Sequence, residues 1–520
     1  MAYLSGIDVE VDHERAVELI TGAAEAGCEE AIKKLVSMYQ SGEGVRRDYR
    51  KAIEWQERLV DLLIESYEKE PDADKGYAVL IALWELGYFC MGIRAWDNAK
   101  KAYEKMSEQS ERFYAEYGDR RFRREMSVSD NELGNIAMAQ GEPEEARAYY
   151  EKGLEIAKAL EKETQTLEAK RDLSISYHYL GQLAYKQNDL TAAWEYYAKA
   201  LEIREALVLE TDTVEPLRDL SINYIAIGDI VMEKGCLDLA RVYYEKAVEI
   251  REAILQETRT VQAAGDLAAS YEKLGNLAEK QHELDKEQEY LDEAREYYEK
   301  ALIIRDGIAK QERTVQAAGD LAAGYEKLGN LAEKQYELDK EQEYLDEARE
   351  YFEKALIIRK SNAKQERTVQ AKRALSVSYN KLGEIVCKQY HLDEAREYYE
   401  KGMEISKAIA METQTIEAKR DLAISYSMLG IIAEEQNKPD EARDYYKTGK
   451  EIFEDILLET DTNESYDDLA ASYYHLGVLD GDRQYLQMAF DIWTMLAEQC
   501  PEDPSFRERA EMAERALQTI

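Results

Sequence analysis

One stretch of 46 residues occurs twice in this chain. The stretch Thr260–Arg305 recurs 54 residues later as Thr314–Arg359. The two copies differ only at Ser270/Gly324, His282/Tyr336 and Tyr298/Phe352. A second copy leaves the rest of a protein undisturbed when each unit packs mainly against its neighbours in the chain, as in stacked repeats. We therefore interpret the stretch as a recent internal duplication within a repeat protein.

The duplicated stretch belongs to a repeat that covers most of the chain. A glycine follows an apolar residue at regular intervals, at Gly87, Gly134, Gly181, Gly228, Gly275, Gly329, Gly383, Gly430 and Gly477. Neighbouring glycines are 47 residues apart, except for the two intervals after Gly275 and Gly329, which are 54 residues. Repeats of about this length indicate stacked supersecondary units.

An alanine and an aromatic residue follow each glycine at fixed distances. In seven units the alanine comes twelve residues after the glycine and the aromatic residue four later, at Ala99/Tyr103, Ala146/Tyr150, Ala193/Tyr197, Ala240/Tyr244, Ala395/Tyr399, Ala442/Tyr446 and Ala489/Trp493. The two longer units shift the pair by seven residues, to Ala294/Tyr298 and Ala348/Phe352. We expect the glycine to let two helices approach closely and the aromatic ring to mesh with the neighbouring helix.

Composition favours helices throughout. Gly (27) and Pro (6) are scarce among 520 residues, and strand signals are missing. We expect helices of roughly 20 residues, about 30 Å long. Polar stretches such as Glu210–Thr213 separate them, where Thr or Asp can cap the next helix. The all-α class therefore follows from composition and period together.

The motif resembles the tetratricopeptide repeat, which has aromatic-x-x-Leu-Gly followed by Ala-x-x-x-aromatic. Tyr177–Gly181 with Ala193 and Tyr197 carries the motif in one unit. The resemblance covers residues 75–520, although the period is 47 residues instead of about 34, and it is similar to long-helix arrays of bacterial signalling proteins. It implies a right-handed superhelical α-solenoid of stacked antiparallel helix pairs. We assign nine repeats to residues 61–502 and a capping helix to residues 503–520, begun by Asp503 and Pro504.

Residues 1–60 contain a different repeat. Tyr3-Leu4-Ser5-Gly6 recurs 36 residues later as Tyr39-Gln40-Ser41-Gly42. This pair resembles the Sel1-like repeat, a relative of the tetratricopeptide repeat. Because the first copy lacks its opening helix, we expect further chain upstream of residue 1 in the parent protein.

The first helix of each pair offers a candidate partner-binding stripe, because positions ten, six and three before the glycine and one and four after it share one helix face. The candidate residues are Arg124, Arg171, Ile175, His178, Gln182, Tyr185, Arg218, Ile222, Asp229, Glu272, Asn276, Glu279, Glu326, Asn330, Glu333, Arg373 and Arg420. The arginines could hold carboxylates or carbonyls of an extended partner. The alternative, which we favour, is that each pairs with an acid of its own or the next unit, such as Asp172 or Asp219.

Two further features have open alternatives. The seven-residue insertions around 282–288 and 336–342 could form a docking ridge, or they could be tolerated lengthening of the repeat; we favour the second.

The tyrosines (38) occur largely as adjacent pairs. We expect one of each pair to be the meshing aromatic residue and the other to pack against the adjacent helix pair, in preference to stacking nucleobases.

Charge and motifs argue against several function classes. A formal charge of −40 disfavours nucleic acids and anionic membranes. Five scattered cysteines are typical of free thiols in a reducing compartment, so we expect a cytoplasmic protein. The five histidines form no metal-binding motif, and no phosphate loop or nucleophile elbow occurs. We therefore expect no catalysis and no cofactor or metal.

Three functions remain. The leading hypothesis is a scaffold whose groove binds a protein or peptide partner, possibly a basic one. The second is the sensor region of a larger bacterial signalling or defence protein. The third is a spacer for which length alone matters. The sequence does not identify the partner or the oligomeric state.

Overall fold

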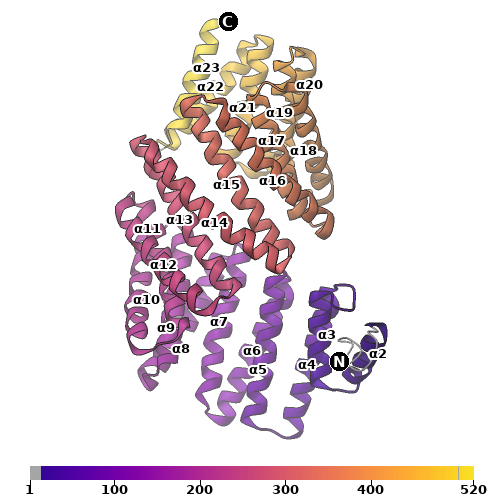
Figure 1. Cartoon of the computed structure of the whole chain (residues 1–520), viewed down its shortest axis with the longest axis vertical. Helices are drawn as coiled ribbons and strands as arrows, with labels where there is room; N and C mark the ends of the chain where they lie inside the picture. Colours follow the sequence, from indigo (N-terminus) through magenta and orange to yellow (C-terminus); the bar gives the residue numbers. More distant parts are fainter. Residues whose placement is uncertain (1–12, 502) are drawn as a thin grey trace. The chain divides into compact units, whose positions relative to one another are not determined.

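The computed structural model describes residues 13–501 and 503–520, and every regular element in these ranges is a helix (Figure 1). The chain divides into two compact units, Met1–Ile254 and Leu255–Ile520. The predicted Sel1-like copy at residues 3–16 begins outside the described residues. The expected all-α class is confirmed.

The first unit begins with three helices that precede the glycine repeats, α2 (His13–Glu25), α3 (Glu29–Ser41) and α4 (Tyr49–Lys69). Helix pairs follow: α5 (Ala73–Gly92) with α6 (Trp96–Tyr117), α7 (Arg120–Gln140) with α8 (Pro143–Thr164), α9 (Leu167–Lys186) with α10 (Leu190–Glu210), and α11 (Val214–Glu233) with α12 (Leu237–Thr258). The unit boundary falls in the last turn of α12.

The second unit continues the same pairing. Its pairs are α13 (Val261–Asp285) with α14 (Gln288–Glu312), α15 (Val315–Asp339) with α16 (Gln342–Glu366), α17 (Val369–Lys388) with α18 (Leu392–Thr413), α19 (Ile416–Glu435) with α20 (Pro439–Thr460), and α21 (Asn463–Asp480) with α22 (Arg483–Gln499). The single helix α23 (Pro504–Thr519) packs against α22. Asp503 accepts a hydrogen bond from the Ser505 backbone at 2.9 Å, so the predicted start of this helix is confirmed.

Each unit is a stack in which a helix contacts the helix before it and the helix after it. The two helices of a pair lie antiparallel (Figure 1), and a second helix such as α8 or α18 packs against the first helix of the next pair. In the first unit the first helices α5, α7, α9 and α11 also contact one another along the stack. The first helices therefore form a continuous layer there.

A glycine–aromatic contact holds each pair together. A Cβ added at Gly228 would lie 2.4 Å from the Tyr244 ring, and one at Gly134 would lie 2.4 Å from the Tyr150 ring. The same contact recurs in every pair from α5–α6 to α19–α20, with Phe352 in place of tyrosine at Gly329. Only glycine leaves room for the ring, which explains why these units keep both residues, even where the insertions change the spacing between them.

The last pair departs from this pattern. Leu486 occupies the space above Gly477, where a Cβ would lie 2.7 Å from Leu486 Cγ. Trp493, which we expected to mesh at this position, is buried and donates a hydrogen bond to Asp467 at 2.7 Å.

Two residues connect most second helices to the following first helix. One residue has a left-handed backbone, such as Gln165 (φ 53°) or Gln414 (φ 56°), and the next is a threonine that caps the first helix. Thr166 Oγ1, for example, accepts a hydrogen bond from the Ala169 backbone at 3.2 Å. Thr213 has the capping position as expected but makes no such side-chain bond.

In each pair of adjacent tyrosines, the ring that does not cover the glycine has neighbours in two helix pairs. Tyr196 lies 6.5 Å from Tyr177, on the first helix of its own pair, and it also packs against an apolar cluster that includes Ala146 and Tyr150 of the preceding pair. The Lys199 ammonium lies 5.7 Å and 5.5 Å from the centres of these two rings. Cation–π attraction at such partly exposed sites stabilises the packing by roughly 0.5–1 kcal/mol. The lysine therefore stabilises the contact between Tyr196 and Tyr177 within their own pair.

The seven-residue insertions lengthen both helices of two pairs. Helices α13 to α16 have 25 residues each, whereas α9, α11, α17 and α19 have 20. The two tips are linked, because Lys334 Nζ lies 3.2 Å from Glu283 of the preceding pair.

We expect Gly228→Ala to destabilise the protein by roughly 1–3 kcal/mol, because the buried Tyr244 ring has nowhere to move. Gly307→Ala is the matched control: no atom lies within 4 Å of its added Cβ, and Gly307 lies inside α14. The control should stabilise the helix by about 0.5–1 kcal/mol. Denaturant unfolding followed by circular dichroism measures both, and equal effects of the two substitutions would refute the glycine–aromatic account.

Candidate partner-binding surface

Four arginines of the candidate stripe form a row of ion pairs within the protein, which we call the ion-pair ladder. Arg124, Arg171, Arg373 and Arg420 each form two hydrogen bonds with an aspartate 48 residues further along, on the first helix of the next pair. The partners are Asp172, Asp219, Asp421 and Asp468 in the same order. These four arginines therefore pair with acids of the next unit, which is the alternative that we favoured from the sequence. Arg218 has the equivalent position on α11.

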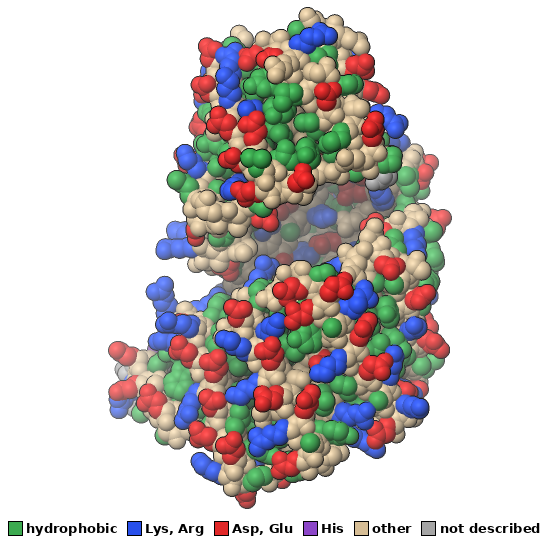
Figure 2. All heavy atoms as spheres, turned by 180° about the vertical axis from the view of Figure 1, so that it is seen from behind, with side chains coloured by type: hydrophobic (Ala, Val, Ile, Leu, Met, Phe, Trp, Pro, Cys, Tyr) green, Lys and Arg blue, Asp and Glu red, His purple; other side chains and the backbone are tan. Residues whose placement is uncertain are grey.

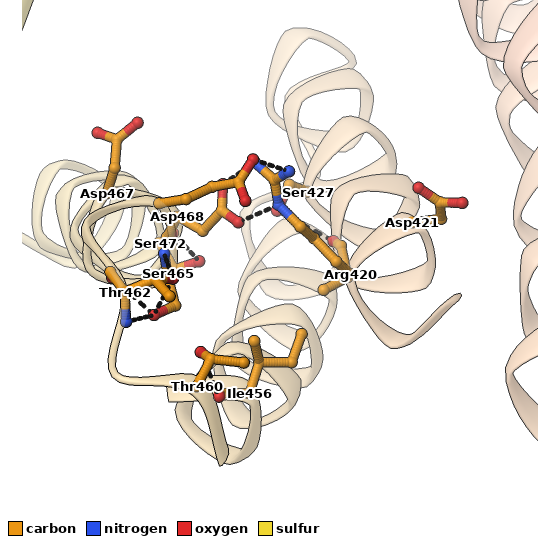
Figure 3. Close-up of polar contacts among 12 residues, drawn as sticks. Arg420, Asp421, Ser427, Ile456, Thr460, Thr462, Ser465, Asp467, Asp468 and Ser472 are labelled. Atoms are coloured by element: carbon orange, nitrogen blue, oxygen red, sulfur yellow. Dashed lines mark hydrogen bonds and ion pairs between the residues drawn. The ribbon is translucent and has the colours of Figure 1, made fainter. Parts of the chain in front are cut away.

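Figure 3 shows how one rung is built. The Arg420 guanidinium points toward Asp468, and its Nη2 lies 3.1 Å from Asp468 Oδ1. Asp421, the next residue on α19, points away from Arg420 and pairs with Arg373 of the preceding unit. Helices α9 and α19 therefore each offer an arginine to one neighbour and an aspartate to the other.

A second row of arginines was not predicted. Arg204, Arg251, Arg305 and Arg359 have equivalent places on the second helices and follow the repeat spacing of 47, 54 and 54 residues. Arg305 pairs with Glu272 at 2.7 Å, and Arg359 pairs with Glu326 at 3.0 Å. Two glutamates of the candidate stripe are therefore neutralised within their own pair. The regular spacing of the arginines could have revealed this row.

Arg204 is the most deeply buried member of the second row. Its Nη1 donates to the Asp219 backbone oxygen at 2.8 Å, and its Nε donates to Ser174 at 3.2 Å. Burial lowers the pKa of Arg204 to about 10. These bonds tie α10 to both α9 and α11, so this arginine joins neighbouring helix pairs.

Two other predicted residues accept hydrogen bonds from the meshing tyrosines. The Tyr244 hydroxyl donates to Asp229 at 2.6 Å, and the Tyr298 hydroxyl donates to Asn276 at 2.8 Å. In the duplicated unit Phe352 offers no hydroxyl to Asn330, which is exposed. The single change from tyrosine to phenylalanine thus leaves a polar side chain open to solvent.

The remaining predicted acids are paired with lysines of the next first helix. Lys334 lies 3.3 Å from Glu279, and Lys388 pairs with Glu333. Glu279 also accepts a hydrogen bond from Tyr298. These contacts join α13 to α15 and α15 to α17, so the acids stabilise the stack.

Other stripe residues in the first unit remain accessible. Gln182 is exposed, and Ile175, Tyr185 and Ile222 are half-buried. His178 is buried instead, with its ring centre 5.1 Å from that of Tyr197. The sequence could not separate His178 from Gln182, because both have the same helix face and only the ring packing distinguishes them.

Charges of both signs cover the surface. Figure 2 shows Lys and Arg side chains interspersed with Asp and Glu over the face in view. No group of three or more His, Cys, Asp or Glu residues that could hold a metal ion occurs in residues 13–501 and 503–520. The helices of the described part also include none that is long and apolar enough to cross a membrane. All five cysteines are free.

Tetratricopeptide-repeat family models match residues 125–206, 223–254 and 375–410. The resemblance found in the sequence is therefore confirmed in these three places, which cover most of α7 to α10 and parts of α11, α12, α17 and α18. Together with the stacked helix pairs, these matches identify the chain as a helical-repeat scaffold. No curated protein matches the chain.

Several solved structures are similar in part. The apo form of RapI is 14% identical, with a TM-score of 0.48 over 76% of this chain and 99% of that one. A signal transduction ATPase with a tetratricopeptide repeat sensor from Pyrococcus horikoshii is 15% identical, with a TM-score of 0.45 over 90% and 57%. BtubC from P. vanneervenii is 20% identical, with a TM-score of 0.39 over 50% and 90%.

A double-mutant cycle tests the ion-pair ladder. We expect Arg171→Gln and Asp219→Asn to show a coupling free energy of about 1 kcal/mol, because the two side chains form a pair with two hydrogen bonds and Asp219 is largely buried. The matched control is the exposed pair Lys158–Glu155 within α8, whose coupling should be near zero. Denaturant unfolding of the four variants of each cycle measures it. Additive effects at Arg171 and Asp219 would show that the ladder does not stabilise the stack.

Burial of His178 predicts a pH dependence. Burial, with a smaller contribution from Arg204, lowers the pKa of His178 from 6.5 to about 3. Between these two values the unfolded chain binds a proton at His178 that the folded chain does not, so stability falls as pH falls.

The substitution His178→Asn removes this proton uptake, and asparagine has the equivalent place in two other units, at Asn131 and Asn380. Between pH 7 and pH 5 the unmodified chain should lose up to about 2 kcal/mol more than the variant. The free energy of unfolding at the two pH values measures the difference. Identical losses would mean that His178 is accessible to protons in the folded state.

Proposed function

We propose that the layer of first helices binds an extended protein or peptide segment. In helical-repeat stacks this layer lines the concave binding surface. The observation that carries the proposal is the difference between two sets of side chains on it. The paired arginines and acids already bond to one another within the protein. In contrast, Gln182, Tyr185 and Ile175 of α9 and Ile222 of α11 remain accessible.

The ion-pair ladder supports this function indirectly. Because the arginines and aspartates are bonded to each other before a partner arrives, the layer is rigid and loses little conformational freedom on binding. The candidate stripe therefore has two roles in our proposal: Arg124, Arg171, Arg373 and Arg420 hold the helices in register, and the accessible residues between them contact the partner.

The finer interpretation of the repeats is part of the proposal. We infer a long-helix type of tetratricopeptide repeat over residues 61–502, which is supported by first helices of 20 residues in four pairs. We infer Sel1-like repeats over residues 1–60, supported by the shorter helices α2 and α3 of 13 residues each. We also propose a cytoplasmic location, which suits five free cysteines.

Selection of random linear peptides on the full chain tests the proposal. Peptides that bind should lose at least about tenfold in affinity when Gln182→Arg and Ile222→Arg together place bulky charges on the first-helix layer. The control is Leu209→Arg on the second helix α10, where the side chain is 88% exposed. Isothermal titration measures each affinity. Failure to select any peptide, or equal loss in the control, would contradict the proposal and favour a spacer.

A further inference from the structure

A pocket opens between the first helices α5, α7 and α9 of the first unit. Its volume is about 360 Å³, which is large enough for one long side chain. Aromatic and aliphatic residues form much of its wall, chiefly Tyr77, Trp84, Tyr179, Ile81, Val128 and Ile175. The pocket belongs to the layer for which we propose partner binding.

The aromatic wall is held in place by further stacking. Trp84 stacks on Tyr88 with ring centres 5.2 Å apart, and Tyr179 stacks on Tyr150 at 5.4 Å. Tyr150 is itself the ring that covers Gly134. The wall is therefore built before any ligand enters, and its rings offer faces that attract cations.

Glu132 supplies a carboxylate to the pocket without a counter-ion. Its Oε2 accepts a hydrogen bond from Asn135 at 3.1 Å, and Asn135 in turn accepts one from the Tyr150 hydroxyl at 2.8 Å. Burial raises the pKa of Glu132, and only the Asn135 bond opposes that rise; within the described residues no Lys or Arg acts on this carboxyl. The Glu132 side chain is half-buried, and a carboxylate withdrawn from water is costly unless a cation pairs with it.

The two arginines that line the pocket do not supply this cation. Arg124 is held by two bonds to Asp172, and Arg171 is held by two bonds to Asp219. A second acid of the lining, Glu125, is buried and lies 3.4 Å from Arg124. The charges of the pocket therefore leave an excess of carboxylate at Glu132.

The acidic side chain of Glu132 contrasts with the residues at the equivalent position of three later units. The position two residues before the repeat glycine is occupied by lysine in three units of the second half, at Lys273, Lys327 and Lys381. Lys327, for example, bonds to Asn276 of the preceding pair at 2.8 Å. At Glu132 the sign of the charge is reversed, and no residue of the described chain compensates it.

We propose that this pocket binds a lysine or arginine side chain of an extended peptide segment of the partner. The cationic end pairs with Glu132, and the aliphatic stem lies against Trp84, Tyr77 and Tyr179. A carboxylate or phosphate would meet the uncompensated Glu132 and be repelled. This inference rests on the proposed function and assigns the chemistry of one contact within it.

The Glu132→Gln substitution tests the assignment, because it removes the charge and keeps the shape. Random linear peptides selected on the unmodified full chain should be enriched in a lysine or arginine. Glu132→Gln should weaken the binding of these peptides at least about tenfold, and Glu151→Gln on the exposed face of α8 should leave it unchanged. Replacing the enriched lysine of the peptide by methionine should cause no further loss in the Glu132→Gln variant.

Each other outcome has a definite meaning. Peptides that bind but are not enriched in basic residues, or that bind Glu132→Gln with full affinity, would overturn the pocket assignment and leave the proposed function standing. Binding of spermidine at Glu132 without any cationic peptide would also overturn it. Folding is checked by thermal unfolding: the variant should be at least as stable as the unmodified chain, because it no longer buries an unpaired carboxylate.

Discussion

The contact between a glycine and an aromatic ring is the constraint on which the rest of the structure depends. Without a Cβ at Gly134 or Gly228, the ring of Tyr150 or Tyr244 lies directly on the first helix of its pair. That approach fixes the distance between the two helices and buries the ring. It also places the tyrosine hydroxyl beside a polar residue of the first helix, such as Asn135 or Asp229. The glycine–aromatic contact therefore sets the packing of the two helices in a pair. It also places the first of the polar contacts on the first helix.

The polar layer connects one pair to the next. Arginine–aspartate rungs join first helices, and deeply buried Arg204 bonds to two neighbouring helices at once. Buried ion pairs add little net stability compared with apolar packing, but they penalise a helix that sits in the wrong register. We infer that apolar contacts stabilise each pair and that the charged contacts specify how pairs stack. The carboxylate of Glu132 is the exception, because no residue in the ranges 13–501 and 503–520 provides a cation for it.

Much of the fold could be predicted from the sequence, because a structure inferred for one repeat unit applies to all the others. The glycine at 47-residue intervals predicted the helix pairs, and Asp503 predicted the start of α23. The candidate surface was harder to predict. His178 and Gln182 share a helix face, yet only His178 is buried, because Tyr197 of the second helix lies against it. Pairing of Glu272 with Arg305 was missed since it depends on a residue 33 positions away on another helix.

Each helix pair of this protein depends on its neighbours and on nothing more distant. Deleting Thr314–Arg367 removes one 54-residue unit and joins Arg313 to Thr368, which restores the sequence Gln-Glu-Arg-Thr-Val-Gln at the junction. Helix α14 then meets α17 with nearly the same residues that α16 presents. Hydrogen exchange of the shortened chain measures the consequence directly. We predict unchanged protection in α2 to α12 and in α18 to α23, whereas loss of protection throughout the chain would contradict the account.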